Sequence, residues 1–403
     1  MSEIMSEIMS DPTHGPLHGV RILDLTWVIG GPFASMILAD LGAEVIKIES
    51  PEGDMARSVP PHTQEGYSPF FFSVNRNKKS VVLNLKTSAG RAAFERLVEV
   101  SDVVYNNFSP RAAASLRLHY EDLKGINPRI ISSSIFGFHD EPPFDDLPAF
   151  DSVIQAMGGV MSITGEENGP PVRVGYQIGD LAGGLYSAIA TLAALQQRER
   201  TGRGTDANVS LFDSQLSLLT WQAQDYLLTG NIPRAMGTKH PMLVPNQSFR
   251  AKDGRDLVVS ATGQHFWAAF CKAIGRPELA FDERYADGNG RVANRKELDR
   301  TLEEAFLCRD QGEWLEILAD ARIPASPVLN VAEALNHPVA SLRNMLAHTE
   351  DPDKPSVRVV GNPVKVGGAK AIFHQPPKLS EHTANVLQEL LGYNEEQVVE
   401  ASG

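Results

Sequence analysis

Short apolar runs alternate with helical patterns along the first part of the chain. Residues 20–25 (VRILDL) form an apolar run of strand length, a turn with two glycines follows, and residues 33–42 (FASMILADLG) repeat apolar side chains at helical spacing. Residues 43–49 (AEVIKIE) return to the strand pattern. This order predicts a strand, a helix and a second strand, and such a unit places its two strands parallel with a right-handed crossover.

The same alternation continues along the chain. Strands are predicted at 80–85, 102–108 and 128–138, and helices at 88–100 and 109–118. Regular alternation of strands and helices is typical of parallel sheets with helices on both faces. The pattern therefore predicts a doubly wound, Rossmann-like α/β domain.

The pattern changes partway along the chain. A helix is predicted over 181–199, followed by a strand over 206–211 and a second long helix. Residues 240–263 then have the features of a β-hairpin with AKDGR as its turn. Helical stretches fill 265–320 without further parallel-strand rhythm.

These patterns predict two domains of different type. A large Rossmann-like domain comprises residues 19–225 and 335–403, and a small α+β domain comprises residues 230–330. Two domains also suit a chain of 403 residues, which exceeds what one hydrophobic core usually supports. The opening MSEIMSEIMS lacks both the basic and the apolar part of a signal peptide, so residues 1–18 are predicted to be a flexible N-terminal extension.

Composition narrows the partners and the compartment. The chain is 42% hydrophobic and 22% charged, and its formal net charge of −13 makes nucleic acid an unexpected partner. No apolar run approaches the ~18 residues that a membrane span needs, so no membrane contact is expected. Cys271 and Cys308 lie in helical patterns without metal-ligand spacing, which predicts reduced cysteines in a soluble, cytoplasmic protein.

The first strand–helix–strand unit departs from a dinucleotide-binding motif. Glu49 ends the second strand where a ribose-binding acid would lie. The turn VIGGPF offers only Gly30 and Gly31, and the third glycine, which allows close packing of helix on sheet, is missing. Pro32 also removes an amide that could have donated to a phosphate. NAD and flavin are therefore not expected as cofactors.

Basic side chains gather near two predicted strand ends. Residues 75–80 (NRNKKS) and Lys86 flank one strand, and residues 106–111 (NNFSPR) end another. Open α/β sheets bind ligands at strand ends, so these side chains are candidates to hold phosphates in an otherwise acidic protein. A solvated turn rich in lysine explains the same pattern equally well.

Asp180 has the most specific setting of the candidate residues. It lies in YQIGDLAGG, residues 176–184, where the long helix is predicted to begin. An aspartate there can be an ordinary cap that accepts hydrogen bonds from the free amides of the first helical turn. The same helix end would also keep a carboxylate ionised, Gly183 and Gly184 would leave room for a ligand, and an ionised carboxylate can attack an activated acyl group. The local pattern leaves both interpretations open.

Other kinds of catalytic site find little support. His139, His240 and His265 are scattered, and the sequence contains neither a Gly-x-Ser-x-Gly nucleophile elbow nor a His-Glu-x-x-His metal pair. Histidine-based catalysis and a metal site are therefore not expected.

The order of motifs resembles that of the class III coenzyme A transferases. The matching stretches run from Gly19 to about residue 390 and read GVRILDLT, GGPFASMILADLGAEVIKIESP, GDMAR, SVNRNKKSVVLNLK, NNFSP, AFDSVIQAMGG, IGDLAGG and ERTGRG. The resemblance implies a homodimer in which two subunits interlace as rings, each with a Rossmann-like large domain and a small domain. It also implies that CoA thioesters and small carboxylic acids are the substrates, and that Asp180 is the nucleophile.

The resemblance further implies a covalent route. The Asp180 carboxylate attacks the donor thioester to give a mixed anhydride and CoA thiolate, and the thiolate then forms an aspartyl-CoA thioester and releases the donor acid. The acceptor carboxylate repeats these steps in reverse. GTKHPMLVPNQSFRAKDG and ITGEENGPPVRVG are most similar to family members that use succinyl-CoA and a C4–C6 dicarboxylic acid such as mesaconate, itaconate, citramalate or glutarate.

The resemblance assigns further site residues position by position. The implied CoA contacts are Val28, Ile29, Arg57, Leu83, Lys86, Asn107, Phe108, Leu116, Phe150 and Asp151. The acceptor acid is expected at His240, Gly263 and Gln264. Where related enzymes have arginines for CoA, this chain has Ser50 and Ser115. Candidates to replace those arginines are Arg57, Lys78, Arg111 and Arg117.

Two departures from the family bear on the reaction. The glycine-rich lid of the oxalate- and formate-specific members is reduced here to SATGQ, which argues against those acids. The related α-methylacyl-CoA racemases use a histidine where this chain has Phe150, and phenylalanine cannot move a proton. A racemase-like enzyme and a non-catalytic CoA-binding protein remain the alternatives to a transferase.

Overall fold

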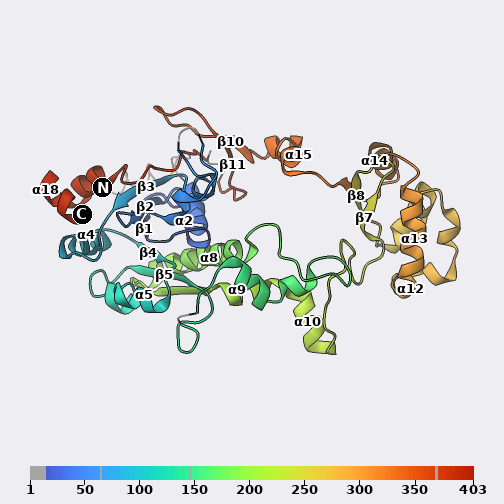
Figure 1. The fold of residues 1–403 in the computed structure, drawn as a ribbon, viewed down its shortest axis with the longest axis horizontal. Coiled ribbons are helices and arrows are strands. Elements are labelled where there is room, and N and C mark those ends of the chain that lie inside the picture. Colours follow the sequence, from blue (N-terminus) through green and yellow to red (C-terminus); the bar gives the residue numbers. More distant parts are fainter. Residues whose placement is uncertain (1–14, 64–65, 146, 368–370) are drawn as a thin grey trace. The chain divides into compact units, whose positions relative to one another are not determined.

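The computed structural model describes residues 15–63, 66–145, 147–367 and 371–403 (Figure 1). Contacts divide the chain into two compact units. The first runs to Val160, resumes over Arg173–Gly230 and ends with Pro338–Gly403, and the second comprises Met161–Val172 and Asn231–His337.

The predicted N-terminal extension, residues 1–18, lies outside the described residues as far as residue 14. Residues 15–18 belong to a turn, in which the Leu17 amide donates to the carbonyl oxygen of Leu41 (2.9 Å). This end of the described chain is thereby tied to the first unit.

Six parallel strands form the sheet of the first unit. In spatial order they are β3 (Lys78–Val82), β2 (Glu44–Glu49), β1 (Arg21–Asp24), β4 (Val103–Asn106), β5 (Ile131–Phe136) and β6 (Asp206–Ser210). The order reverses at β1, because β2 and β3 lie on one side of it and β4 to β6 on the other. This is the arrangement of a doubly wound sheet, so the predicted α/β class is confirmed.

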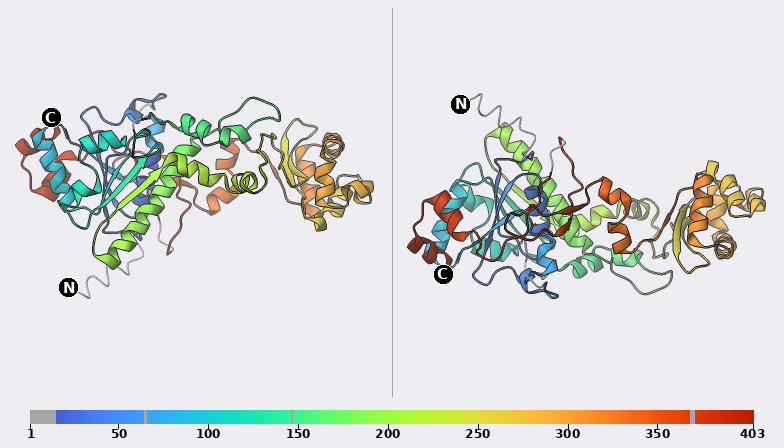
Figure 2. Two further views of the ribbon diagram at one scale, coloured as in Figure 1. Left: turned by 90° about the horizontal axis from the view of Figure 1, so that it is seen from below. Right: turned by 90° about the horizontal axis from the view of Figure 1, so that it is seen from above.

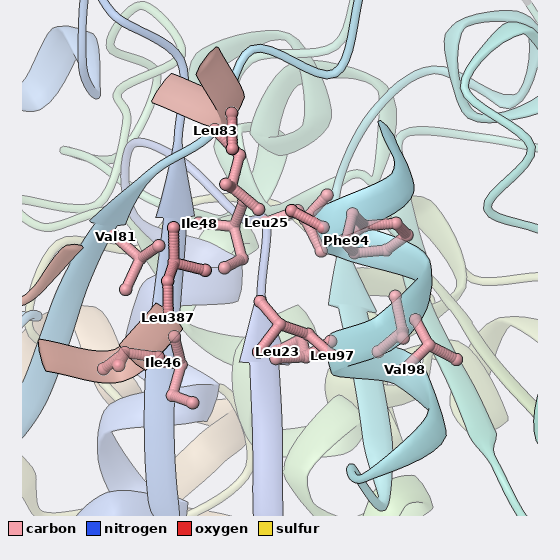
Figure 3. Close-up of a cluster of buried hydrophobic side chains, with 14 of the residues drawn as sticks. Leu23, Leu25, Ile46, Ile48, Val81, Leu83, Phe94, Leu97, Val98 and Leu387 are labelled. Atoms are coloured by element: carbon pink, nitrogen blue, oxygen red, sulfur yellow. The ribbon is translucent and has the colours of Figure 1, made fainter. Parts of the chain in front are cut away.

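Successive residues of each strand serve opposite faces of the sheet. Ile22 packs with α2 (Gly30–Asp40) and α8 (Ile178–Thr201) in one buried cluster. Leu23, the next residue, packs in another cluster with helix α4 (Ser88–Glu99), as Figure 3 shows. The alternation follows from the two-residue period of a strand, and it buries both faces of the sheet.

The C-terminal end of the chain completes the second of these clusters. Helices α17 (Thr383–Leu391) and α18 (Glu395–Ser402) pack beside α4, and Leu387 reaches the strands in Figure 3. The blue-green α4 and the red C-terminal helices lie side by side in both views of Figure 2. Residues far apart in the sequence therefore share one core.

Shorter elements connect this framework. The remaining helices of the first unit are α3 (Pro69–Phe72), α5 (Pro110–Ser115), α6 (Tyr120–Leu123), α7 (Asp151–Met157), α9 (Leu211–Leu218), α10 (Thr220–Thr229) and α16 (Pro338–Leu342). Strands β10 (Leu346–His348) and β11 (Arg358–Val360) form an antiparallel pair. The predicted second long helix is wrong as a single element: Leu219 separates α9 from α10, and Thr220, the first residue of α10, has a left-handed backbone (φ 41°).

The second unit combines a small antiparallel sheet with helices. The predicted hairpin is confirmed as β7 (Asn246–Arg250) and β8 (Asp256–Ser260), and Gly254 takes the positive φ of 79° that its tight turn requires. Strand β9 (Ala325–Pro327) pairs with β8. The helices are α11 (Gln264–Ala273), α12 (Gly288–Ala293), α13 (Arg295–Phe306), α14 (Gln311–Asp320) and α15 (Val331–Leu335).

Helix α8 overturns one expectation about composition. It is long and apolar enough to cross a membrane, with a mean hydropathy of 1.4 over 18 residues, so the prediction that no segment reaches this threshold was wrong. Half of that stretch is buried. The helix packs on β5, β6, α2 and α9, and a core helix of a soluble protein has the same character.

Candidate active site

Asp180 is the third residue of α8, one turn inside the position that a cap would occupy. The helix begins at Ile178 and its N-cap is Gln177, so the interpretation of Asp180 as a cap is wrong. The carboxylate of Asp151 serves the helix end instead. Its Oδ1 accepts from the Gly179 amide (2.9 Å) and, at 3.4 Å, from the Asp180 amide. A carboxylate from α7 therefore stabilises the first turn that carries Asp180.

Asp151 also changes the electrostatics of Asp180. Burial, and secondly the negative charge of Asp151, raise the pKa of Asp180 to about 7. The expectation that the helix end keeps this carboxylate firmly ionised is therefore wrong in direction. Loss of water around the carboxylate and the like charge behind it outweigh the favourable field of the helix end.

A cavity of about 350 Å³ lies in front of Asp180. Its walls come from the β1–α2 turn, the segment after β4, the end of β5 and the loop that precedes α7. These segments meet at the carboxyl ends of β1 and β4, where the strand order reverses. Open α/β sheets bind ligands at this position, because the loops on the two sides of the reversal diverge and leave a crevice.

The turn between β1 and α2 is fixed by side chains that lie outside it. The Asn107 amide group bonds both main-chain groups of Trp27, accepting from its amide (3.0 Å) and donating to its carbonyl (2.9 Å). The Val28 amide donates to Oδ1 of Asp54 (3.2 Å). Val28 has a φ of 69°, which a β-branched residue adopts only when its surroundings determine the backbone.

The glycines near Asp180 have a packing role. A Cβ at Gly184 would lie 2.5 Å from the carbonyl oxygen of Gly30, and one at Gly183 would lie 2.3 Å from Cδ2 of Leu211. These positions face α2 and α9 rather than a ligand. The prediction that both glycines leave room for a ligand is therefore wrong; they let α8 approach its neighbours closely.

Comparison with known proteins identifies the family. Residues 17–383 match the sequence profile of CoA-transferase family III. The chain therefore belongs to CoA-transferase family III. The resemblance found from the sequence motifs is confirmed, and coenzyme A thioesters are the substrates that this family uses.

Named relatives of this CoA-transferase share most of its length. It is 40% identical over 375 residues to the acetyl-CoA:oxalate CoA-transferase of Acetobacter aceti, which covers 92% of this chain and 95% of that enzyme. It is also 40% identical over 385 residues to the succinyl-CoA:mesaconate CoA-transferase of Haloarcula marismortui, with the same coverage. The structure of a CaiB/BaiF family protein from Brucella suis, 36% identical, superposes with a TM-score of 0.84 and covers 94% of this chain and 100% of that one.

Five of the residues predicted to contact CoA line the cavity of this CoA-transferase together with Asp180. They are Val28, Ile29, Asn107, Phe108 and Phe150. Phe150 is 64% exposed although it is aromatic. Asp151, the sixth predicted residue of this region, is buried behind Asp180 as the helix-end acceptor.

The other four predicted CoA contacts do not line this cavity. Leu83 is buried in the core, Leu116 packs against that core, and Lys86 is exposed. The guanidinium of Arg57 is occupied by Glu49 (2.7 Å) and by the carbonyl oxygen of Pro377 (2.9 Å). Their contacts with CoA stay predictions.

Two of the basic residues considered for the CoA phosphates differ sharply in accessibility. Lys78 is buried, and its ammonium donates to Asp24 (2.9 Å), Asn75 (2.9 Å) and the carbonyl oxygen of Pro32 (3.0 Å). It cannot meet a phosphate without breaking these bonds. Arg117 is exposed and lies 4.0 Å from Asp122, so it is open to a ligand.

The three residues predicted for the acceptor acid belong to the second unit. The Gln264 side chain donates to the Ala286 carbonyl oxygen (2.8 Å) and accepts from the buried Arg291 (3.0 Å). Nδ1 of His240 accepts from the Met242 amide (3.2 Å), and burial together with Arg295 lowers the pKa of His240. Gly263 is the N-cap of α11. Their contact with an acceptor stays a prediction.

Several cavity residues were missed by sequence reasoning. Trp27, Met55, His139, Phe144 and Asp145 also line the cavity. Trp27 directly precedes the predicted Val28, and His139 follows the end of β5, so position after a strand was a usable signal for both. Within the described ranges, no group of three or more His, Cys, Asp and Glu side chains is placed to hold a metal ion.

Proposed function

We propose that this family III enzyme moves CoA from succinyl-CoA to a dicarboxylic acid, with Asp180 as the covalent carrier. The observation that carries the proposal is a partly desolvated carboxylate, with its pKa raised to about 7, in a ligand-sized cavity at the reversal point of the sheet. The placement of Asp180 in that cavity supports the role of nucleophile, and family membership supports the substrate class.

The chemistry is two acyl transfers run forward and then in reverse. A carboxylate oxygen of Asp180 attacks the carbonyl carbon of the donor thioester, the carbon–sulfur bond breaks, and CoA leaves as thiolate. The thiolate attacks Cγ of Asp180 in the mixed anhydride, and the donor carboxylate leaves. The acceptor carboxylate then attacks Cγ of the aspartyl-CoA thioester, and CoA leaves as thiolate. The thiolate attacks the acceptor carbonyl carbon of this second anhydride, which gives acceptor-CoA and frees the Asp180 carboxylate.

The residues around Asp180 suit this chemistry. A carboxylate with little hydration loses little solvation when it attacks, while near neutral pH a large fraction of it is ionised. Trp27, Val28 and Phe108 give the cavity apolar walls. We infer that these walls keep water from the anhydride, which would otherwise hydrolyse.

The CoA contacts divide into two groups in this proposal. Val28, Ile29, Asn107, Phe108 and Phe150 hold the thioester end, because they share the cavity with Asp180. The remaining predicted contacts, Arg57, Leu83, Lys86 and Leu116, would meet the nucleotide end outside that cavity.

The acceptor is proposed to be a dicarboxylate because the named relatives use one. Mesaconate and oxalate are both dicarboxylic acids, and the enzymes named for them are equally similar to this chain. The shortened SATGQ segment, which contains Gly263 and Gln264, favours a mesaconate-like acid over oxalate. We propose that His240, Gly263 and Gln264 meet the acceptor. Initial rates with succinyl-CoA or acetyl-CoA against oxalate, mesaconate, itaconate, citramalate and glutarate distinguish these acids.

We also propose a cytoplasmic homodimer of interlaced subunits, each with a large domain of residues 19–225 and 335–403 and a small domain of residues 230–330. Exposed apolar side chains support a partner surface on the first unit. Ile189 of α8 is 60% exposed, and Leu227 and Leu228 of α10 are 73% and 76% exposed. A partner subunit that covers these side chains would remove their apolar surface from water.

The role of Asp180 is tested by Asp180→Ala. CoA exchange between succinyl-CoA and the accepted acid is expected to fall at least 1000-fold, roughly the loss that follows removal of a covalent nucleophile. The matched control is Asp213→Ala, because Asp213 is exposed at the third position of α9 and does not line the cavity. It is expected to keep wild-type exchange.

Trapping separates the transferase from its alternatives. Hydroxylamine added during turnover is expected to leave a hydroxamate on Asp180, which peptide mass spectrometry locates. Unchanged exchange by Asp180→Ala would contradict the covalent role. Deuterium uptake at Cα of a 2-methylacyl-CoA without an acceptor acid would indicate a racemase, and CoA binding without turnover of any acid would indicate a binding protein.

A further inference from the structure

A network of buried charges lies under the turn that forms one wall of the cavity. It consists of Asp24, Lys47, Glu49, Asp54, Arg57 and Lys78. Three of these side chains are acidic and three are basic, so the network is electrically balanced. Five of the six are almost fully buried, and Arg57 is the most exposed. Buried charges are costly to desolvate, and here each one is offset by partners of opposite sign.

Lys47 connects the network to the turn. Its ammonium donates to the carbonyl oxygen of Thr26 (2.6 Å) and forms an ion pair with Oδ2 of Asp54 (2.9 Å). Thr26 lies two residues after the end of β1 and Lys47 belongs to β2, so a strand of the sheet holds the early part of the turn.

Asp54 fixes the next part of the same turn. Its Oδ1 accepts from the Val28 amide (3.2 Å) and from the Ala56 amide (2.9 Å), while its own amide donates to Glu49 (3.0 Å). Val28 is the residue with the left-handed backbone, and it lines the cavity with Asp180. The hydrogen bond from the Val28 amide to Asp54 therefore connects the network directly to the cavity wall.

Lys78 and Asp24 of the network form hydrogen bonds with helix α2. Lys78 bonds Asp24 and the carbonyl oxygen of Pro32 in the first turn of α2, and Asp24 accepts from Ser35 of the same helix (2.7 Å). The helix packs on α8 close to the nucleophile, because a Cβ at Gly30 would lie 3.0 Å from the carbonyl oxygen of Asp180. One network thus holds both the turn and the helix that bound the space in front of Asp180.

We propose that Lys47 and Asp54 are positioning residues of the transfer reaction, which hold the strained Val28 turn so that the thioester meets Asp180 in a reactive geometry. This inference rests on the proposed function. Neither side chain lines the cavity, so their effect passes through the main chain of Thr26 and Val28. A displacement of about 1 Å at such a turn lowers turnover about 100-fold.

The test compares Lys47→Met with a matched control, Arg198→Met. Arg198 is also buried and ion-paired, with Asp102 at 2.8 Å, but Asp102 precedes β4 and so lies at the amino ends of the strands, whereas the cavity lies at their carboxyl ends. Both variants lose a buried cation, and urea unfolding reports the loss of stability in each. We expect Lys47→Met to lower kcat about 10–100-fold with KM for the CoA thioester changed less, and Arg198→Met to keep kcat.

Asp54 supplies a second comparison that does not depend on Lys47 variants folding well. Asp54→Asn keeps a side-chain oxygen that can accept from the Val28 amide, whereas Asp54→Ala removes it. Positioning of the turn predicts that Asp54→Asn retains most of the kcat that Asp54→Ala loses. The rate of hydroxylamine trapping at Asp180 is expected to fall in the same order.

Three outcomes would overturn the inference. Equal kcat losses in Lys47→Met and Arg198→Met at equal stability would show a general structural role, as would equal losses in Asp54→Asn and Asp54→Ala. The proposed function fails separately, by unchanged exchange in Asp180→Ala. Loss of exchange in Asp180→Ala together with wild-type kcat in Lys47→Met and Asp54→Ala would therefore reject only the positioning role.

Discussion

Asp151 and Asp180, which are 29 positions apart in the sequence, lie together at the start of α8. Asp151 binds the amide of Gly179 and places its negative charge beside Asp180. One side chain thereby stabilises the start of α8 and makes ionisation of Asp180, the proposed nucleophile, less favourable. The two effects are independent: the hydrogen bond needs only an oxygen at Oδ1, and the pKa effect needs the charge.

Asp151→Asn is predicted to keep the hydrogen bond to the Gly179 amide and to lower the pKa of Asp180. Because the pKa of Asp180 is raised to about 7 by burial and then by Asp151, removing the charge of Asp151 lowers it. Only ionised Asp180 attacks, so kcat/KM falls as the pH drops through that pKa, and the acidic limb of the variant is expected at lower pH than that of the wild type. The displacement is partial, since burial, the larger cause, remains.

The measurement is the pH dependence of kcat/KM for the donor, which reports the pKa of the free enzyme. Asp145→Asn is the control, because Asp145 lines the same cavity but is not among the causes of the raised pKa of Asp180. Its acidic limb is expected to coincide with that of the wild type. An unshifted limb in Asp151→Asn would show that the charge of Asp151 does not reach Asp180.

At the residue scale, sequence reasoning located the wall of the cavity better than its electrostatics. Val28, Ile29, Asn107, Phe108 and Phe150 line the cavity with Asp180, and their contact with CoA stays a prediction. The direction of the Asp180 pKa was predicted wrongly, because it is set by burial and by the distance to a residue on another helix. Neither quantity can be read from the letters around a single aspartate.

At the scale of elements, the packing of α2 against α8 determines where Asp180 lies relative to the cavity. Gly184 on α8 lies against the main chain of Gly30 on α2, and both helices bound the cavity in front of Asp180. Side chains larger than hydrogen would separate the two helices. The small residues at this crossing therefore set the position of Asp180 relative to the β1–α2 turn.

Gly184→Ala is expected to destabilise the protein by about 1–3 kcal/mol and to lower kcat. Its new Cβ would lie 2.5 Å from the Gly30 carbonyl oxygen, which belongs to the main chain and cannot rotate away. The matched control is Gly312→Ala in α14, where a Cβ meets no atom within 4 Å and helix propensity predicts a gain of about 0.5–1 kcal/mol. Urea unfolding and steady-state rates measure both variants, and a stable, fully active Gly184→Ala would contradict close packing at this crossing.

Elements were predicted well in type and order, and less well at their ends. The period of apolar residues identified the strands and the main helices because both faces of the sheet are buried. The start of α8 was placed three residues late, since the first turn is stabilised by Asp151, a side chain from outside the local sequence. The break between α9 and α10 was missed because no glycine or proline marks Thr220.

At the scale of the whole molecule, the site described so far is built from the first unit alone. Every residue that lines the cavity belongs to that unit, while His240, Gly263 and Gln264 belong to the second. The proposed transfer needs both a thioester and an acid at Asp180. The proposed contact of His240, Gly263 and Gln264 with the acceptor acid therefore stays a prediction.

The proposed interlaced dimer makes a prediction about dilution. Two subunits that pass through one another cannot separate without unfolding, so the dimer is expected to persist at nanomolar concentration, with about twice the chain mass of 43.9 kDa. An ordinary side-by-side dimer would dissociate into folded monomers according to its Kd. Mass photometry at nanomolar concentration measures the mass, and far-UV circular dichroism across a urea series shows whether loss of the dimer and loss of structure coincide. A folded monomer at any dilution would contradict interlacing, while activity retained by that monomer would place the acceptor residues in the same subunit as Asp180.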